Sequence, residues 1–399
     1  MNVPELNRLL KNVSVPGTRQ MANRVAGKPE SIDLTLGQPD FPVPGAVRDR
    51  VMQAVDSQPM RYSHNRGTME LRKAITDFYK DKYKADYEPS DEVIVTNGGS
   101  EALDTIFRTI INPGDEVIMP APVYTGYEPI VTMLGGITVL VDTTDTGFIP
   151  TAQKIEAAMT ERTKAVLLNY PNNPTGAVYP EETVASLVEL FKRHDIFVVV
   201  DEMYAENTLD GEHHSFTSYP DIKDRLLAVN GLSKSHAMTG WRIGWLIGNA
   251  EMVEKMTLVH LYNTLCASMP SQIAALEALT GAAGAPAAMN AAYQERRDYI
   301  YRRLIDMGLD TVLPEGAFYI FPSIKKYNES SFGFAVELLE EAGVAVVPGS
   351  AFSEYGEGHI RISFATSMEN LEEAADRMER FLEGKRGKQR NIQLRRIPK

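Results

Sequence analysis

The chain has 399 residues, of which 43% are hydrophobic and 24% charged, a balance typical of a globular enzyme with about two domains. A formal net charge of −12 argues against a nucleic-acid-binding surface, and no apolar run approaches the roughly 18 residues of a membrane span. The single cysteine, Cys266, excludes an internal disulfide and has no partner at metal-ligand spacing, so no metal site is expected. Because no basic-then-apolar export signal follows Met1, we expect a cytoplasmic protein.

In the middle of the chain, short apolar runs alternate with amphipathic stretches. The predicted strands among these runs are 93–95, 116–119, 165–168, 196–200 and 243–247. Strands that are apolar on both faces indicate a mainly parallel sheet between helix layers, and the stretch 181–193 after Pro180 predicts one of the helices. The sequence therefore predicts an α/β fold with a large, doubly wound, mixed but mainly parallel sheet.

The pattern changes near residue 285. Predicted helices at 293–307, 333–342 and 368–383 alternate with strand-forming runs at 317–321, 344–347 and 359–364. These elements favour a smaller α+β domain with a short sheet. We therefore expect a large domain at 45–284, a small domain at 285–384, and an N-terminal segment, 1–44, that packs on the small domain because it is too short to fold alone.

The last residues, 385–399, form a basic segment with seven Lys or Arg and no acid. Such a run at a terminus is typical of a disordered, solvated tail, which we expect here. A tail that binds RNA or a protein partner is the alternative.

A lysine between two hydroxyls, Ser233-Lys234-Ser235, follows the apolar run 226–229. An amine in a partly dry pocket at a strand end can lose its proton near neutral pH and attack an aldehyde. The hydroxyls and the nearby Arg242 suit a phosphate group, and an aldehyde and a phosphate on one small molecule describe pyridoxal phosphate. Viewed alone, the triplet is more often a surface turn with a solvated lysine, so the other segments decide.

Two further segments place polar groups where strands end. The turn Asn97-Gly98-Gly99-Ser100 follows the strand 93–95 and opens a helix, whose N–H groups and dipole suit an anion, although such a turn is often only a tight turn. Asp201 ends the strand 196–200, where open α/β sheets bind ligands. A buried carboxylate there needs a cation, for which a protonated pyridine nitrogen would serve; a helix N-cap is the alternative.

Two more polar residues stand out. Asn173 lies in the rigid turn 169–176, with two prolines and a glycine, which could hold its amide against a ring oxygen or be an ordinary loop. Arg361 has opposite parity to Ile360 and Ile362 in an alternating strand, so it is expected to face a polar cleft, where its planar fork can grip a carboxylate.

In their order and spacing, these segments resemble the fold-type I pyridoxal-phosphate aminotransferases of the aspartate aminotransferase superfamily, over roughly residues 34 to 383. The segments that follow the family pattern are 36–41, 171–176 and 233–242. The resemblance implies an aspartate aminotransferase-like fold, the cofactor pyridoxal 5'-phosphate, amino acid and 2-oxo acid substrates, and ping-pong kinetics. It also implies a homodimer with shared active sites, without nucleic acid or membrane partners.

The resemblance carries residue roles with it. Lys234 looks like the catalytic lysine, which bonds to the cofactor and later moves the Cα proton. The matches to cofactor contacts are Asp201 at the pyridine nitrogen, Asn173 and Tyr204 at the ring oxygen, Tyr124 stacked on the ring, and Gly99, Ser100, Ser233 and Arg242 around the phosphate. Tyr62 matches a tyrosine that reaches the phosphate across the dimer interface, and Gly37, Asn173 and Arg361 match the contacts to the substrate carboxylate.

The substrate is less sharply indicated. One aspartate-directed bacterial subgroup of the family has a lysine directly after the Gly-Gly of the phosphate turn, where this chain has Ser100. Segments 231–236, 318–323 and 347–350 resemble more closely the Firmicute-type enzymes described as N-acetyl-LL-diaminopimelate or aromatic aminotransferases. We expect one of these two activities. An aspartate aminotransferase and a C–S β-lyase are the alternatives, and a ligand-sensing regulator of this fold is disfavoured by the missing helix-turn-helix region.

Overall fold

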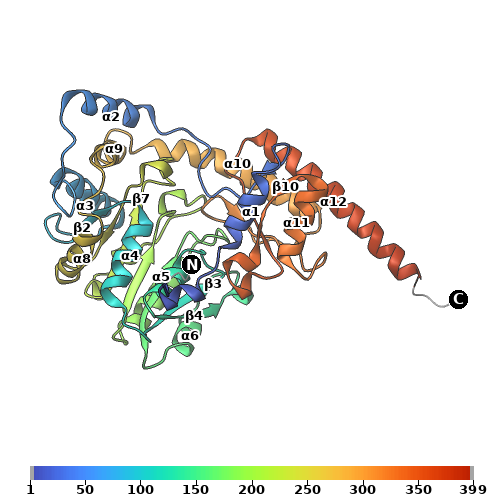
Figure 1. The fold of residues 1–399 in the computed structure, drawn as a ribbon, viewed down its shortest axis with the longest axis horizontal. Helices are drawn as coiled ribbons and strands as arrows, with labels where there is room; N and C mark the ends of the chain where they lie inside the picture. Colours follow the sequence, from blue (N-terminus) through green and yellow to red (C-terminus); the bar gives the residue numbers. More distant parts are fainter. Residues whose placement is uncertain (1–3, 396–399) are drawn as a thin grey trace.

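A seven-stranded sheet lies at the centre of the larger part of the protein (Figure 1). The structure is a computed structural model that describes residues 4–395, with side chains for residues 4–386. The strands, in their order across the sheet, are β2 (Val93–Thr96), β8 (Gly244–Ile247), β7 (Leu226–Gly231), β6 (Phe197–Asp201), β5 (Thr163–Asn169), β3 (Glu116–Ala121) and β4 (Ile137–Asp142). Strand β8 runs in the opposite direction to the other six strands of this sheet, so the predicted α/β class with a mixed, mainly parallel sheet is confirmed.

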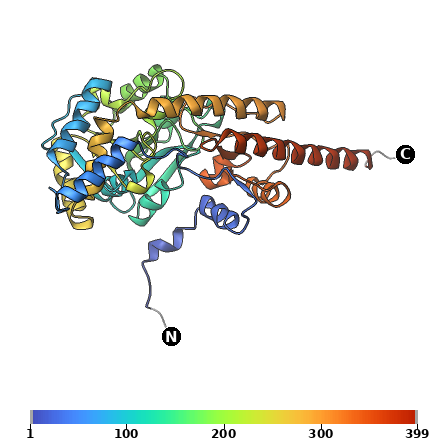
Figure 2. The same cartoon turned by 90° about the horizontal axis from the view of Figure 1, so that it is seen from above.

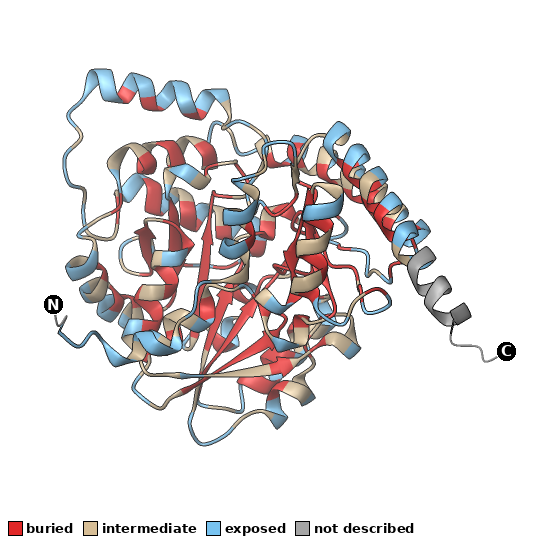
Figure 3. Ribbon diagram, turned by 45° about the vertical axis from the view of Figure 1, so that its right-hand side comes forward, coloured by how far each residue is buried: buried red, intermediate tan, exposed pale blue. Residues whose placement is uncertain are grey.

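Helices cover both faces of this sheet, which is why its central strands are apolar on both sides. In β6, Val198 and Val200 contact one hydrophobic cluster while Val199 contacts the other, as the two-residue period of a strand requires. The first cluster includes side chains of α2 (Gly45–Ser57), α3 (Met69–Tyr83), α6 (Ala152–Ala157), α7 (Glu181–Phe191) and α9 (Met269–Leu279). The second includes α4 (Gly99–Ile110), α5 (Tyr127–Met133) and α8 (Ala250–Asn263), and Figure 3 shows the strands buried between the layers.

The smaller part contains two short sheets packed against helices. Its helices are α10 (Ala285–Asp306), α11 (Ser331–Ala342) and α12 (Met368–Arg395), and its antiparallel sheet has the order β11 (Val347–Pro348), β12 (Ile360–Ser363) and β9 (Tyr319–Ile320). The strands are shorter than predicted. The run 344–347 divides between two sheets, because β10 (Val344–Ala345) pairs instead with β1 (Ile32–Asp33).

The N-terminal segment contacts the smaller part. Met21 of α1 (Gly17–Val25) and Leu34 belong to its hydrophobic cluster, and the Ser363 amide donates to the Leu34 carbonyl at 2.9 Å. The η1 helix (Arg8–Asn12) of the same segment contacts α5 of the larger part, and the division of the chain into domains stays a prediction. The short 3₁₀ helices are η1 (Arg8–Asn12), η2 (Thr144–Thr146), η3 (Ala205–Asn207), η4 (Phe216–Ser218), η5 (Pro220–Ile222), η6 (Thr239–Trp241), η7 (Gly349–Phe352) and η8 (Glu354–Gly356).

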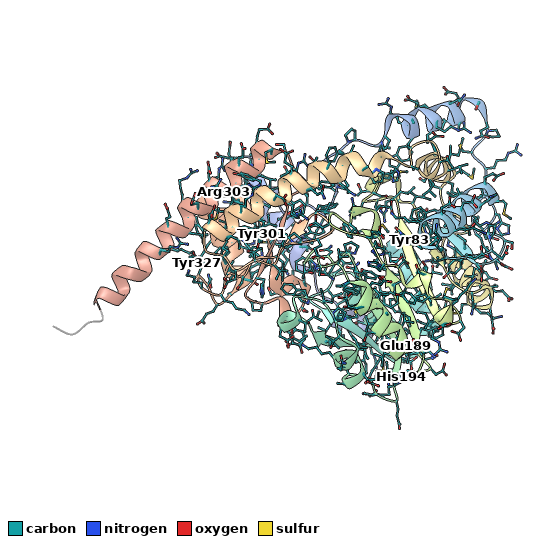
Figure 4. The ribbon with its side chains drawn as sticks, turned by 180° about the vertical axis from the view of Figure 1, so that it is seen from behind. Tyr83, Glu189, His194, Tyr301, Arg303 and Tyr327 are labelled. Atoms are coloured by element: carbon teal, nitrogen blue, oxygen red, sulfur yellow. The ribbon has the colours of Figure 1, made fainter. Side chains whose placement is uncertain are left out.

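Helix α12 is longer than predicted and runs out from the body of the protein (Figures 1 and 2). It continues to Arg395, so residues 385–395 of the basic segment are helical, whereas the composition of this segment predicts disorder. Residues 396–399 lie outside the described part. Tertiary contacts explain the start of this extension, because the Arg386 guanidinium donates to the Tyr327 hydroxyl at 2.7 Å and Lys385 pairs with Glu337. Figure 4 shows Tyr327 and Arg303 on the elements beside α12, where Arg303 pairs with Asp376 at 2.7 Å.

Two absences hold for the described residues. None of their helices combines the length and the apolar character that a bilayer span requires. Within the same part of the chain, no three His, Cys, Asp or Glu side chains are grouped so that they could hold a metal ion.

Candidate active site

A cavity of about 440 Å³ opens at the carboxyl ends of the parallel strands. Such a place is where open α/β sheets bind ligands. It brings together these residues predicted from the sequence: Gly37, Gly99, Ser100, Tyr124, Asn173, Asp201, Tyr204, Ser233, Lys234, Arg242 and Arg361. Tyr62 is the exception, since it does not line the cavity of its own chain and its side chain is 83% exposed.

Lys234 lies three residues after the end of β7 and points into the cavity. Its Nζ donates to the Gly37 carbonyl at 2.5 Å and stands 5.6 Å from the centre of the Tyr204 ring. Burial, together with the positive charges of Arg361 and Arg242, lowers the pKa of the Lys234 amine to about 8. A useful fraction of this amine is therefore unprotonated near neutral pH, as a nucleophile or a general base requires.

Asp201 is the last residue of β6, and its buried carboxylate receives two hydrogen bonds. The Tyr127 hydroxyl donates to one oxygen at 2.7 Å, and the Met203 amide donates to the other at 3.0 Å. Burial raises the pKa of the Asp201 carboxyl, and these two bonds oppose the rise. Among residues 4–386 no basic side chain forms an ion pair with Asp201. The buried carboxylate therefore lacks a cationic partner, which a ligand could supply.

Arg361 projects from the middle of β12 into the cavity, as its parity in the strand predicts. Its guanidinium donates to the Asn173 side-chain oxygen at 2.9 Å and to the Thr35 carbonyl at 2.7 Å, while its Nε has no hydrogen-bond partner. The side chain is buried, yet no acidic residue of the described part pairs with it. A buried guanidinium without an anion is costly, so this geometry fits a ligand carboxylate.

The turn before α4 forms a cradle closed by Arg242. Gly98 has a φ of +89°, and a Cβ added there would stand 2.6 Å from an Arg242 nitrogen, so only glycine suits this position. Arg242 donates to the Thr239 carbonyl at 2.9 Å and forms no ion pair among the described residues. Gly99 and Ser100 begin the 12-residue helix α4, whose N–H groups and dipole add to the positive potential of this guanidinium.

The carboxylate of Glu101 fixes this turn by hydrogen bonds at both of its oxygens. This role of Glu101 was not predicted from the sequence. One oxygen accepts from the Asn97 amide and side-chain nitrogens at 2.5 and 2.9 Å, and the other accepts from His260 at 2.6 Å and from Thr264 at 2.8 Å. Burial alone would raise the pKa of Glu101, but the bonds from His260, Asn97 and Thr264 together lower it below its ordinary value. The phosphate turn is thereby tied to α8.

Replacing Glu101 with alanine is expected to destabilise the fold by about 3 kcal/mol, because it leaves several buried donors unpaired. Denaturant titration measures this change in the free energy of unfolding. Because the pKa of Glu101 is depressed in the folded state, its contribution should be present above the ordinary value of 4.5 and decline as the pH falls through the lowered pKa. Asp104→Ala is the control, since Asp104 pairs on the same helix with the half-exposed Arg108, and it should cost less than about 1 kcal/mol. Equal losses in the two variants would contradict the assignment.

Three charged groups in the cavity therefore lack a partner of opposite charge. Asp201 needs a cation, Arg361 needs an anion, and Arg242 with the start of α4 forms a second anion site. Pyridoxal phosphate with an amino acid substrate carries the complementary groups, namely a pyridinium nitrogen, a carboxylate and a phosphate, and its aldehyde suits the Lys234 amine. The fold and this set of side chains define a pyridoxal-phosphate-dependent transaminase.

Comparisons with known proteins agree. Residues 29–378 match the profile of the family described as aminotransferase class I and II, and the chain belongs to this family, which uses pyridoxal phosphate. A probable N-acetyl-LL-diaminopimelate aminotransferase from Bacillus subtilis is 48% identical over 381 residues, covering 96% of both chains. The crystal structure of an aromatic aminotransferase from Pyrococcus horikoshii superimposes with a TM-score of 0.88 at 36% identity, over 92% of this chain and 99% of that one. An aspartate aminotransferase structure from Thermotoga maritima gives 0.90 at 37% identity, over 95% and 100%.

Proposed function

We propose that this aminotransferase acts by a ping-pong mechanism with N-acetyl-LL-diaminopimelate or an aromatic amino acid as amino donor and a 2-oxo acid as acceptor. The observation that supports this choice is the number of cations in the cavity. Lys234, Arg242 and Arg361 are the basic residues that line it, and the cofactor aldehyde, its phosphate and the substrate α-carboxylate would engage all three. Within the described residues of one chain, no cation is left for the nearby second carboxylate of aspartate.

The relatives support the two proposed substrates unequally. N-acetyl-LL-diaminopimelate also has a second carboxylate, but it lies several carbons farther from the reacting centre than that of aspartate and would extend beyond these cations. The 48% identity to the B. subtilis protein favours this substrate. The likeness to the P. horikoshii enzyme favours an aromatic one.

The proposed binding roles follow from the contacts of each side chain. Asp201 would hold the protonated ring nitrogen, and Tyr127 keeps that carboxylate oriented. Asn173 and Tyr204 would contact the ring oxygen, and Tyr124 would stack on the ring. Around the phosphate we place Gly99, Ser100, Ser233 and Arg242, which all line the cavity. Arg361, with Gly37 and Asn173, would bind the substrate carboxylate and so fix the orientation of the substrate Cα.

Bound pyridoxal phosphate supplies an aldehyde that takes up the amino group and a ring that withdraws the electrons left at Cα. The chain contributes the proton transfer. With a pKa of about 8, the Lys234 Nζ can accept the proton from the substrate Cα and give it up again within the cavity. The cavity walls, formed by buried residues such as Tyr204 and Tyr319, limit the access of water to this proton.

A screen of half-reactions tests the substrate assignment. The cofactor-loaded enzyme is mixed with N-acetyl-LL-diaminopimelate, phenylalanine or aspartate in turn, and the loss of the cofactor's visible band is followed without any 2-oxo acid. The fastest change per concentration is expected with one of the first two compounds. A faster change with aspartate would refute the proposed specificity. Release of pyruvate from cystathionine without an amino acceptor would identify a C–S β-lyase instead.

Replacing Arg361 with alanine is expected to weaken amino acid binding by about 2–5 kcal/mol, because the substrate carboxylate would be buried without its partner. The apparent dissociation constant in the same half-reaction measures this effect. Lys325→Ala, a change outside the cavity lining on the same part of the fold, should leave it unchanged. An unaltered affinity in Arg361→Ala would remove this residue from the substrate site.

We also propose a homodimer with shared sites. Several large apolar side chains of the described residues are exposed, including Met52, Val55, Tyr62 and Tyr262, at 50–88% exposure. Exposed apolar side chains of this size suit an interface between copies, in which a second copy would bring its Tyr62 to the phosphate end of the cavity. Sedimentation of the protein at micromolar concentration tests the assembly.

Finally, we place the enzyme in the cytoplasm. Its single cysteine fits a reducing compartment, and an enzyme that consumes free amino acids and 2-oxo acids finds its substrates there.

A further inference from the structure

Tyr319 lines the cavity beside the residues proposed to bind the substrate and the cofactor. It is the first residue of β9 and pairs in the sheet with Ser363 of β12. Because Ser363 is two residues after Arg361 on β12, the sheet holds the Tyr319 backbone close to Arg361. Its side chain is fully buried, and a phenol hydroxyl in such a place needs a hydrogen-bond partner.

Three residues of the proposed site meet at this one side chain. Its hydroxyl lies 2.7 Å from the Tyr204 hydroxyl, and the Arg361 guanidinium stands 4.4 Å from the centre of its ring. A Cβ on Gly37 would come within 2.9 Å of the same hydroxyl, so glycine there leaves the space that the hydroxyl needs. Tyr319 thus touches the residues proposed for the substrate carboxylate and for the cofactor ring oxygen.

The hydrogen bond between the two tyrosines can run in either direction. Burial and the Tyr319 hydroxyl raise the pKa of Tyr204 well above its usual range, whereas Arg361 and the Tyr204 hydroxyl partly offset the rise that burial causes in Tyr319. If Tyr204 donates to a ligand oxygen, the Tyr319 hydroxyl must be the donor between the two tyrosines. Its bond to Tyr204 then strengthens the bond from Tyr204 to the ligand.

We propose that Tyr319 is a positioning residue with two separable functions: its ring face orients Arg361 for the substrate carboxylate, and its hydroxyl supports Tyr204 as donor to the ring oxygen of the cofactor. This inference rests on the proposed function, because it needs the roles given there to Arg361 and Tyr204. Two substitutions separate the functions. Tyr319→Phe removes the hydroxyl and keeps the ring, and Tyr319→Leu removes both.

The first measurement is a pH titration of the cofactor-loaded enzyme. The visible absorbance changes when a proton is lost next to the ring oxygen, and the midpoint of this transition gives an apparent pKa. Tyr319→Phe is expected to raise the apparent pKa of this transition by roughly half to one unit, because a weaker bond from Tyr204 leaves more electron density on the ring oxygen. Tyr293→Phe is the matched control, since Tyr293 is a buried tyrosine of the same hydrophobic cluster whose hydroxyl has no hydrogen-bond partner among the described residues. A transition that moves no more in Tyr319→Phe than in this control overturns the role of the hydroxyl.

The second measurement is the affinity for 3-phenylpropionate, a carboxylate without an amino group, by calorimetry. Tyr319→Phe should bind it within twofold of the parent enzyme, whereas Tyr319→Leu should bind it roughly 5- to 30-fold more weakly, because the buried cation–π contact with Arg361 is lost. Equal affinities in Phe and Leu variants overturn the role of the ring. If the parent enzyme has no visible transition, or binds no carboxylate related to either proposed amino donor, the proposed function itself fails, which is a different outcome.

Discussion

Replacing Lys234 with alanine is expected to reduce transamination by about four orders of magnitude, the upper end of what a positioned proton-transfer group contributes. The variant loses both the amine that bonds to the cofactor and the base that moves the Cα proton. In the parent enzyme the Lys234 amine is buried in the cavity with a pKa of about 8, so no solvent-exposed lysine can substitute for it. Single-turnover kinetics with the best amino donor from the screen measures the loss.

Lys192→Ala is the control for this experiment, because Lys192 lies at the surface after α7 and pairs there with Glu189. Its turnover should equal that of the parent enzyme. A second readout follows the covalent bond directly: borohydride reduction and peptide mapping should find the reduced cofactor on Lys234 alone. Substantial turnover in Lys234→Ala, or an adduct on another side chain, would refute the assigned mechanism.

Replacing Asp201 with asparagine has the second-largest expected effect, a fall in kcat/KM of roughly 10²- to 10⁴-fold. The substitution keeps the size of the side chain and removes the charge that would balance the protonated ring nitrogen, and breaking such a buried pair costs about 3–5 kcal/mol. Tyr127→Phe keeps the charge and removes one hydrogen bond to it, so its loss should be about tenfold or less.

A change at the protein surface provides the reference for both variants. Asp86 pairs with Lys80 in solvent, so Asp86→Asn should leave kcat/KM unchanged. If Asp201→Asn retained more than a tenth of the parent activity, the carboxylate would not act on the ring nitrogen. If Tyr127→Phe lost more activity than Asp201→Asn, the hydroxyl itself would be the more important group.

The residues at strand ends could be predicted from the sequence because local pattern and chemistry coincide there. Asp201 follows a continuous apolar strand, and Lys234 and Gly99 follow two others, so the rule that ligands bind at the carboxyl ends of parallel strands placed all three in one cleft. Arg361 could be predicted from its parity in an alternating strand. The structure brings these four residues together as expected.

Other members of the site leave little local signal. The hydrogen bonds of Tyr127 to Asp201 and of Tyr319 to Tyr204 join positions 74 and 115 residues apart. Such contacts depend on how elements far apart in the sequence pack against each other, and a single sequence does not show this packing. The Thr35 carbonyl that accepts from Arg361 is a backbone group, so no residue type at that position could indicate it. For Tyr127, the three-residue spacing from Tyr124 would have been a usable hint.

Errors in the predicted elements have similar causes. The run 344–347 looks like one strand, but the chain changes partner at Val346 and so enters two sheets. The long helix α12 was expected to end at Glu383, where the charge pattern becomes entirely basic. Its continuation is favoured by Lys385 and Arg386, whose partners Glu337 and Tyr327 lie on other elements.

The cavity wall is assembled from three separate stretches of chain, which contribute Lys234 from the loop after β7, Arg361 from the small sheet and Gly37 from the N-terminal segment. A molecule that binds all three stretches raises the free energy of unfolding of the protein. The increase is about 2.7 kcal/mol when its concentration is a hundred times its dissociation constant. Besides taking part in the reaction, the cofactor would then stabilise the contacts between these stretches of chain. Copies without bound cofactor would therefore unfold more readily on heating and be cleaved faster by proteases, so cofactor binding would affect the lifetime of the protein as well as its activity.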